Sequence, residues 1–315
     1  LKEPKMKIVC LDADTLGVDA DFSALEALGE FISCKNTKNS ETIERLKNAD
    51  IVITNKVLIT KEVIENTNLK MIAISATGMN NVDLKAAAAK NITVKNVAGY
   101  STNSVVQQTF ASLFEMLNKV SYYSSYCKNG EWVKSEIFTH LSSPITEIFG
   151  KEFGVVGLGT IGKNVAEIAS AFGANVRYYS TSGMHEDDDF ISVSLDSLLK
   201  TSDILSIHAP LNERTKNLIG ENEIAKMKDG AILMNFGRGG IVDENALAKA
   251  VDEKNLHVIL DVLEIEPMKE NHPLLNVKNG QNVLITPHIA WASVEARKKL
   301  VELLVKNIKD FINGK

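Results

Sequence analysis

One stretch constrains the fold of this chain more than any other: a strand, a glycine-rich turn and a helix follow one another between Phe153 and Phe172. The apolar run Phe153–Val156 leads into Gly157-Leu158-Gly159-Thr160-Ile161-Gly162, and a helical pattern continues from Lys163. In a G-x-G-x-x-G turn the first glycine permits a tight bend, the second allows close backbone approach to a pyrophosphate, and the third lets helix and strand pack together. The helix N-terminus adds free N–H groups for the phosphates. We therefore predict a dinucleotide site here, against the alternative of a glycine turn that binds nothing.

Short apolar runs alternate with helical patterns on both sides of this stretch, which predicts an α/β fold with parallel sheets covered on both faces. The predicted strands are 7–11, 50–54, 71–75 and 92–94 in a first series, and 153–156, 175–180, 203–208, 231–236, 257–262 and 282–287 in a second. A long helix begins near Asn103, and its apolar stripe of Val106, Phe110, Leu113 and Leu117 indicates a packing surface between domains or subunits. The 315 residues suffice for two domains.

Composition argues against several classes of partner. The net charge of −5 predicts no electrostatic attraction to nucleic acid or to an anionic membrane. No apolar run approaches the roughly 20 residues of a membrane helix, and the first residues lack the hydrophobic region of a signal peptide. Cys10, Cys34 and Cys127 are widely spaced, which predicts buried, inert thiols and neither a disulfide framework nor a metal site. We expect a cytoplasmic protein.

Three chemically useful side chains follow late strands of the second series. Arg238 comes just after 231–236, Glu266 just after 257–262, and His288 at the end of 282–287. Ligands of open α/β sheets bind beyond the carboxyl ends of the strands, so these residues are expected near the same crevice as the glycine turn. Each alone could be a surface charge, a loop acid or a structural histidine, but their recurrence at successive strand ends favours a shared site.

These three side-chain types suit hydride transfer to a 2-oxo acid. A guanidinium binds a carboxylate with two parallel donors, which is a role for Arg238. The ketone oxygen needs a proton as the hydride arrives, and an imidazole such as His288 can donate it. A carboxylate beside that imidazole, here Glu266, fixes its tautomer and favours its protonated form. His208 is expected to line a cofactor or packing turn.

The choice between NAD and NADP depends on the end of the strand 175–180. An acid about 20 residues after the glycine turn usually binds the ribose of NAD, but Ser180 stands there. A hydroxyl does not repel the 2′-phosphate of NADP, yet no Arg or Lys follows to attract it, and an acidic run at 186–189 lies nearby. The residues leave NAD and NADP both open, and we expect weak discrimination between them.

Nearly the whole chain resembles the D-isomer-specific 2-hydroxyacid dehydrogenase family. The matching stretches are SATGMNNVDL, VAGYSTNSVVQQTFASLFEML, GKEFGVVGLGTIGKNVA, SIHAPLNERTKNLI, AILMNFGRGGIVDENAL, LDVLEIEP, HPLL and NVLITPHIAWAS. The resemblance implies an NAD(P)-dependent enzyme that reduces small 2-oxo acids to D-2-hydroxy acids. In it, Arg238 binds the substrate carboxylate, Glu266 is the acid of the dyad and His288 is the proton donor.

Further expectations follow from the resemblance. Backbone amides near Thr77 and Gly78 are expected to hold the substrate carboxylate, and further cofactor contacts are expected at Ile161, Gly162, Phe236, Gly237, Arg238 and Asp261. The stretches GYST and HIAWAS are most similar to glycerate dehydrogenases, also called hydroxypyruvate reductases. Ser180 departs from the Asp that NAD-specific members usually carry.

The family fold implies a flavodoxin-like substrate domain of residues 1–100 and 287–315, and a Rossmann cofactor domain of residues 101–286. The long helix from Asn103 is then expected to form a homodimer contact.

Three other functions compete with this interpretation. A D-lactate-type or other 2-hydroxyacid dehydrogenase differs only in substrate. A formate or phosphite dehydrogenase shares the scaffold, but formate-oxidising relatives tend to have an amide at the position of Glu266. A non-enzymatic NAD(H)-sensing binding protein can retain all catalytic residues, so an assay of cofactor oxidation is needed to separate it from an enzyme.

Overall fold

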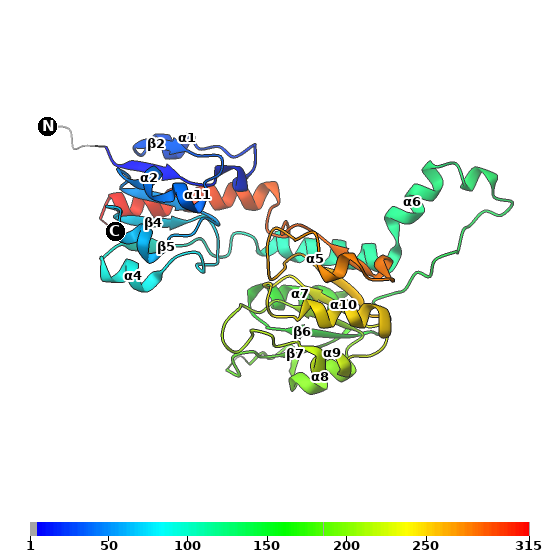
Figure 1. Cartoon of the computed structure of the whole chain (residues 1–315). Helices are drawn as coiled ribbons and strands as arrows, with labels where there is room; N and C mark the ends of the chain where they lie inside the picture. The colour runs from blue at the N-terminus through cyan, green and yellow to red at the C-terminus, as the bar shows by residue number, and fades with distance from the viewer. Residues whose placement is uncertain (1–4, 185, 315) are drawn as a thin grey trace. The chain divides into compact units, whose positions relative to one another are not determined.

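The computed structural model describes residues 5–184 and 186–314, and the chain divides into two compact units. Unit 1 comprises Leu1–Ser101 and Trp291–Lys315, and unit 2 comprises Thr102–Ala290. Each unit contains one parallel β-sheet with helices packed against it (Figure 1). The prediction of two doubly wound parallel-sheet folds is therefore confirmed.

The crossing back from unit 2 to unit 1 lies after Ala290, slightly beyond the boundary expected near Pro287. The reason is local. The N–H groups of Ile289 and Ala290 each donate to the Asp261 carboxylate at 2.9 Å, and Thr286 Oγ1 donates to it at 2.6 Å. These bonds hold residues 286–290 to the sheet of unit 2.

The sheet of unit 1 has five strands in the order β2-β1-β3-β4-β5, which is the flavodoxin-like order. The strands are β1 (Lys7–Cys10), β2 (Glu30–Ser33), β3 (Ile51–Thr54), β4 (Met71–Ile74) and β5 (Thr93–Lys95). The helices are α1 (Ser23–Glu26), α2 (Thr42–Leu46), α3 (Lys61–Glu65), α4 (Leu84–Ala89) and α11 (Val294–Ile312), with 3-10 turns at Ala13–Leu16 and Asn39–Glu41. Successive strand residues point to opposite faces, so Ile51 packs in one cluster with α11 whereas Val52 packs in another with α3 and α4. Both faces are covered, which explains the uninterrupted apolar runs.

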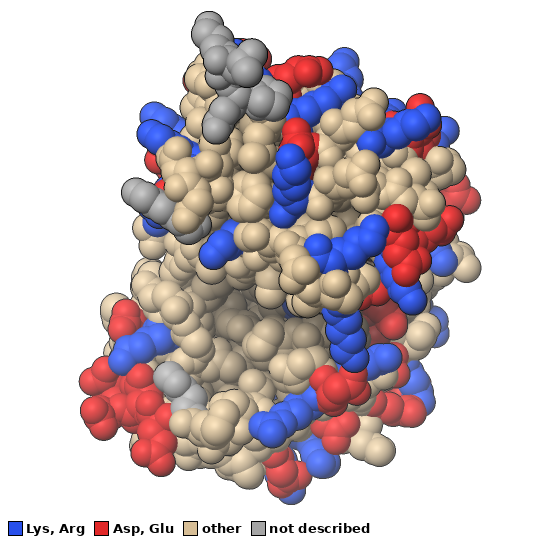
Figure 2. Space-filling view, turned by 90° about the vertical axis from the view of Figure 1, so that its left-hand side faces the viewer, with Lys and Arg blue, Asp and Glu red and all other residues tan. Residues whose placement is uncertain are grey.

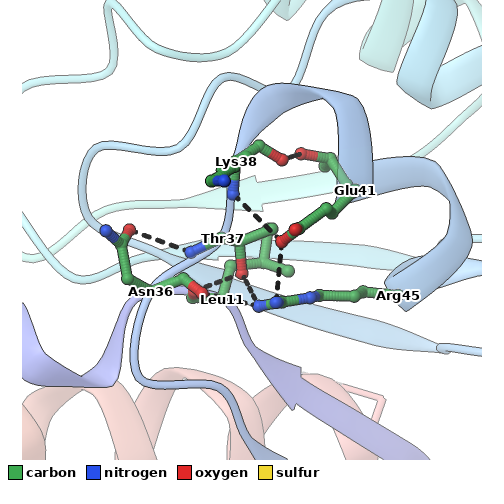
Figure 3. Close-up of polar contacts among 7 residues, drawn as sticks. Leu11, Asn36, Thr37, Lys38, Glu41 and Arg45 are labelled. Atoms are coloured by element: carbon green, nitrogen blue, oxygen red, sulfur yellow. Dashed lines mark hydrogen bonds and ion pairs between the residues drawn. The ribbon is translucent and has the colours of Figure 1, made fainter.

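A polar network fixes the segment that follows the edge strand β2. Thr37 donates through Oγ1 to the carbonyl of Leu11, and Arg45 of α2 donates to Thr37 Oγ1 and, at 2.7 Å, to the carbonyl of Asn36. The second terminal nitrogen of Arg45 donates to Glu41 at 2.7 Å, and Figure 3 shows these groups gathered around Thr37. Because Thr37 is buried, the network ties α2 to the carboxyl end of β1.

The sheet of unit 2 has seven strands in the order β12-β11-β10-β9-β6-β7-β8. Counted within the unit, six of them follow the Rossmann order 3-2-1-4-5-6, and β12 extends the sheet. The strands are β6 (Glu152–Val156), β7 (Asn175–Tyr179), β8 (Ile191–Ser192), β9 (Ile204–Ile207), β10 (Ile232–Asn235), β11 (His257–Leu260) and β12 (Val283–Ile285). The helices are α5 (Thr102–Asn118), α6 (Val120–Lys128), α7 (Thr160–Ala171), α8 (Leu195–Thr201), α9 (Glu221–Lys226) and α10 (Glu244–Glu253), with 3-10 turns at Trp132–Lys134, Pro273–Leu275 and Gly280–Asn282.

The apolar stripe of α5 is buried. Val106, Phe110, Leu113 and Leu117 all lie in the interior, and the ring of Phe110 stacks on Phe172 at the end of α7, with ring centroids 6.2 Å apart. Phe110 therefore packs on a helix of its own unit, and a packing surface between domains or subunits stays a prediction for the rest of the stripe.

A projecting segment follows α5. Figure 1 shows α6 and the chain after it extending away from the sheet of unit 2, and we call residues 119–149 the arm. Tyr122 bonds to Ser142 at 2.7 Å and Tyr123 donates to the carbonyl of Ser143, so the two halves of the arm are joined. The arm exposes large apolar side chains: Val120, Trp132, Val133, Ile137, Phe138, Leu141, Ile145 and Phe149.

Charged side chains are mixed on the face shown in Figure 2, where Lys and Arg are interspersed with Asp and Glu. Within the described residues, no helix combines the length and apolarity needed to cross a membrane. Desolvation raises the pKa of the buried Cys10 thiol to about 12, so it stays protonated. Cys127 on α6 is exposed, and the prediction of buried thiols is wrong for it.

Candidate active site

The carboxyl ends of the parallel strands of unit 2 bring its candidate residues to one edge of the sheet. The glycine turn follows β6, His208 follows β9, Arg238 follows β10, and Asp261 and His288 follow β11 and β12. The strand order reverses between β6 and β9, and ligands of such sheets bind outside the carboxyl ends at this switch point.

The glycine turn has the geometry that a dinucleotide site needs. Gly157 has a φ of +89°, a conformation that glycine adopts without strain. A Cβ on Gly162 would lie 2.1 Å from the carbonyl oxygen of Gly157, so only glycine lets α7 begin this close to the turn. A Cβ on Gly159 would meet nothing within 4 Å, so the turn offers open space at its second glycine. Residues from Thr160 to Gly162 form the first turn of α7, whose N–H groups can bind phosphate.

Asn235 shapes the loop that carries Arg238. The buried Asn235 amide donates to the carbonyl of Arg238 at 2.9 Å and accepts the N–H of Gly237 at 3.0 Å. A Cβ on Gly237 would lie 2.7 Å from the carbonyl oxygen of Ala209, so the loops after β10 and β9 are in close backbone contact beside Phe236. Asn235 could not be identified from the sequence, because a buried amide at a strand end has no distinctive spacing.

Asp261 holds the segment that presents His288. Besides the three donors to its carboxylate described above, its carbonyl accepts the N–H of His288 at 2.9 Å. His288 has a φ of +55°, a left-handed conformation that is uncommon outside glycine, and the bonds to Asp261 support it. Asp261 therefore has a structural role in unit 2 besides the cofactor contact predicted for it.

His288 and Glu266 form a hydrogen-bonded pair. His288 Nδ1 lies 2.7 Å from Glu266 Oε2, and the other oxygen of Glu266 accepts the N–H of Leu263 at 3.1 Å. The two side chains are 24% and 28% exposed, so they are open to a small ligand. With Nδ1 bonded to the carboxylate, the opposite ring nitrogen, Nε2, is the one that can donate a proton outward. The structure thus joins two residues that are 22 positions apart in sequence.

His208 is unsuited to proton donation. Desolvation lowers its pKa to about 3, and its Nε2 is bonded to Ser206 Oγ at 2.8 Å. Its Nδ1 is buried without a hydrogen-bond partner among the described residues. The ring stacks on Phe236, with centroids 6.4 Å apart, as a packing role for the turn predicts.

A cation from another loop lies beside the loop after β7. Arg214, from the loop after β9, donates to the carbonyl of Ser182 at 3.0 Å, two residues beyond Ser180. The acidic run is partly neutralised, because Lys163 Nζ lies 2.8 Å from Asp187 and 3.2 Å from Asp189. Hydrogen bonds to these two carboxylates raise the pKa of Lys163. The hydrogen bond from Lys163 lowers the pKa of the Asp187 carboxyl. Sequence spacing around Ser180 could not reveal Arg214, which is brought there by the strand order.

Thr77 and Gly78 follow β4 in unit 1. Thr77 Oγ1 donates to the carbonyl of Val97 at 3.1 Å, and the carbonyl of Thr77 accepts from Asn96 Nδ2 at 2.7 Å. These bonds fix the loop of unit 1 in which the substrate contacts are predicted. Among residues 5–184 and 186–314, no cluster of His, Cys, Asp or Glu could hold a metal ion.

Comparison with known proteins identifies the family. Residues 110–290 match the family model described as D-isomer specific 2-hydroxyacid dehydrogenase, NAD binding domain. A hydroxypyruvate reductase of Blautia hydrogenotrophica is 38% identical over 317 residues, with 98% of each chain covered. The chain belongs to the D-isomer-specific 2-hydroxyacid dehydrogenase family. This confirms the family predicted from the sequence.

Two further relatives extend the comparison. A glycerate dehydrogenase of Methylorubrum extorquens is 36% identical over 312 residues, covering 98% of this chain and 97% of the relative. Among solved structures, an acyclic imino acid reductase (Bsp5) in complex with NADPH and D-Arg is 30% identical, with a TM-score of 0.85 and 98% of both chains covered. The matched NAD-binding model lies within unit 2, where the glycine turn was predicted to bind a dinucleotide.

Proposed function

We propose that this member of the family reduces small 2-oxo acids to D-2-hydroxy acids with NADH or NADPH, with hydroxypyruvate and glyoxylate as its substrates. The observation that carries the proposal is the 2.7 Å bond between His288 Nδ1 and Glu266, which leaves Nε2 to protonate the ketone oxygen. Relatives named hydroxypyruvate reductase and glycerate dehydrogenase, similar over nearly their full length, support the choice of substrate.

The residues of unit 2 fit a dinucleotide. Gly157, Gly159, Thr160, Ile161 and Gly162 would hold the pyrophosphate at the N-terminus of α7, where the space above Gly159 is open. Ser180 would lie at the adenosine ribose, and Phe236, Gly237, Arg238 and Asp261 at the nicotinamide end. When bound, the cofactor supplies the hydride.

The other residues bind and protonate the substrate. Arg238 and the amides of Thr77 and Gly78 would bind its carboxylate. Glu266 holds the His288 ring with Nδ1 bonded, so that Nε2 can donate a proton as the ketone becomes an alkoxide. Units 1 and 2 would serve as the substrate and cofactor domains, respectively.

Cofactor choice is proposed to be weak. Ser180 supplies no carboxylate to repel a 2′-phosphate, and Arg214 supplies a cation close to the same loop. A structural relative that binds NADPH shows that this fold accepts the phosphorylated cofactor. We expect kcat/KM values for NADH and NADPH within about two orders of magnitude of each other, given about 1.4 kcal/mol per tenfold.

A homodimer in the cytoplasm is proposed as the working form. The arm exposes eight large apolar side chains within residues 119–149, and Phe138 and Leu141 are 89% and 78% exposed. Exposed apolar side chains concentrated in one segment are typical of an interface, and a second copy related by twofold symmetry could cover both arms at once.

The test is an assay of NADH and NADPH oxidation with hydroxypyruvate, glyoxylate, pyruvate and a branched 2-oxo acid. We expect turnover, with the highest kcat/KM for hydroxypyruvate or glyoxylate and a D-2-hydroxy acid as product. Highest kcat/KM with pyruvate would indicate a D-lactate-type enzyme, and turnover only when an amine is added would indicate an imine substrate. Tight cofactor binding without turnover of any substrate would contradict the enzymatic proposal and support an NAD(H)-sensing protein.

A further inference from the structure

The loop that carries Glu266 lacks regular secondary structure. Residues 263–272 connect the end of β11 to the 3-10 turn Pro273–Leu275, and Glu264, Ile265 and Glu266 are exposed. No helical or sheet ladder therefore directs the Glu266 carboxylate toward His288. The direction must come from contacts that hold the loop itself.

The two peptides on either side of Leu263 are the part of the loop that is held. The N–H of Leu263 donates to Glu266 Oε1 at 3.1 Å, and the N–H of the next peptide, that of Glu264, donates to Glu244 Oε1 at 2.7 Å. Gly239, next to Arg238, lies against this second peptide so closely that a Cβ there would be 1.9 Å from the Leu263 carbonyl oxygen. The orientation of the backbone around Leu263 is thus passed to Glu266 through a hydrogen bond.

Glu244, the first residue of α10, holds the other end of the loop as well. Its Oε2 lies 2.8 Å from His272 Nε2, and the two side chains are only 13% and 8% exposed. His272 Nδ1 accepts the N–H of Leu274 at 3.3 Å, so the ring proton is on Nε2 and is donated to Glu244. Leu274 is buried in the cluster that includes α10. The Glu244 carboxylate therefore accepts hydrogen bonds from both the Glu264 N–H and the His272 ring, and these bonds tie the two ends of the loop together.

We infer that Glu244 and His272 are positioning residues for the proton donor: this buried His–carboxylate pair holds residues 263–272 so that the more exposed pair of Glu266 and His288 keeps its geometry. The inference rests on the proposed function, in which His288 donates the proton and Glu266 orients it. Displacing a catalytic group by about 1 Å can cost up to about a hundredfold in rate, so the buried pair is expected to act on kcat.

The substitution His272→Asn keeps one hydrogen bond of the His272 ring and removes the other. An Asn side chain can still accept the N–H of Leu274, because its Oδ1 lies near the position of Nδ1, but it cannot reach Glu244. We expect kcat for hydroxypyruvate reduction to fall about tenfold or more, with the dissociation constant of NADH unchanged within about twofold. His272→Gln, whose amide can donate to Glu244, should recover most of the activity.

The decisive comparison repeats His272→Asn in a Glu266→Gln background. If His272 acts through Glu266, the second substitution should change kcat by less than about twofold there, since residues that act as a unit are non-additive. Glu221→Gln removes an exposed ion pair between α9 and Lys249 of α10, and serves as the control that should leave kcat unchanged. Glu244→Gln provides a second variant should His272→Asn fold poorly, and the same loss of kcat is expected from it.

Three results would overturn the inference. An equal loss of kcat in both backgrounds would mean that the buried pair stabilises unit 2 without positioning Glu266. A wild-type kcat in His272→Asn, while Glu266→Gln lowers it, would reject the positioning role and leave the proposed function intact. A wild-type kcat in Glu266→Gln itself would reject the dyad, and the inference with it.

Discussion

Two histidines follow strands of the same sheet, His208 after β9 and His288 after β12, and their surroundings give them opposite properties. His208 is held neutral by desolvation, with a pKa of about 3, whereas His288 is open to a ligand and bonded to a carboxylate. Catalysis near neutral pH needs a group that can carry and release a proton, so the environment selects His288.

The neutral His208 has a consequence for stability. Its pKa is about 3 in the folded chain and near 6.5 in an unfolded one, so between these values the unfolded state binds more protons. Above about pH 6.5 the neutral His208 makes its full contribution to the unfolding free energy. This contribution is lost as pH falls, by about 2 kcal/mol between pH 7 and pH 5. We expect His208→Gln to lose less unfolding free energy than wild type over this interval in urea titrations. Equal losses would show that His208 is solvated.

Arg214 is the residue with which the cofactor proposal can be tested most selectively. Loss of a charge-assisted hydrogen bond is worth about 1.5–3 kcal/mol, so Arg214→Ala should lower kcat/KM for NADPH about ten- to a hundredfold and leave that for NADH within about twofold. Ser180→Asp should shift preference the same way, mainly by raising KM for NADPH. Lys216→Ala, an exposed cation in the same loop, is the control. Equal effects on both cofactors would place the discriminating group elsewhere.

Part of the site could be predicted from the sequence, because its residues follow the ends of strands. Arg238, Glu266 and His288 could be proposed because each follows an apolar run, and the carboxyl ends of parallel strands share one edge. Arg214 and Glu244 were missed, because each acts through a partner in another loop, fixed by the fold, and leaves no local pattern. Asn235 was missed because a buried amide at a strand end has no distinctive spacing.

Among the elements, the glycine turn and the start of α7 contain two glycines with different roles. Gly162 lies against the backbone of Gly157, whereas Gly159 faces open space. Gly162→Ala forces a Cβ to within 2.1 Å of a carbonyl oxygen, so it should lower the unfolding free energy by about 1–3 kcal/mol and weaken NADH binding. Gly159→Ala should weaken NADH binding at nearly unchanged stability. Thermal unfolding and NADH fluorescence titration measure both effects, and equal stability loss in the two variants would contradict this assignment.

Strands that are buried along their whole length could be predicted from the sequence. β3, β4, β9 and β10 are buried throughout, and each was predicted within a residue or two. The edge strands β2 and β8 were missed: the four residues of β2 are mostly exposed and the two of β8 are both exposed. An edge strand needs little apolar surface, so its sequence resembles a loop.

For the molecule as a whole, the exposed apolar side chains of the arm are the basis of the proposed homodimer. Phe138→Asp combined with Leu141→Asp places charge on the two most exposed of its aromatic and leucine side chains, and we expect monomers in sedimentation equilibrium where wild type is dimeric. Val18→Asp, on a fully exposed apolar residue of unit 1, should leave the dimer intact. A monomeric wild type, or a dimer unaffected by the arm variant, would contradict the proposed interface.

His288 donates the proton to the substrate in the proposed mechanism, and His288→Gln removes that donor. An amide of similar size cannot act as a general acid, and loss of general acid catalysis costs about 10²–10⁴ in rate. The measurement is kcat for hydroxypyruvate reduction at saturating cofactor, together with the dissociation constant of NADH for the same variant. We predict that kcat falls at least about a hundredfold while NADH binding changes by less than about threefold. A His288→Gln enzyme with near-normal kcat would show that His288 is not the proton donor.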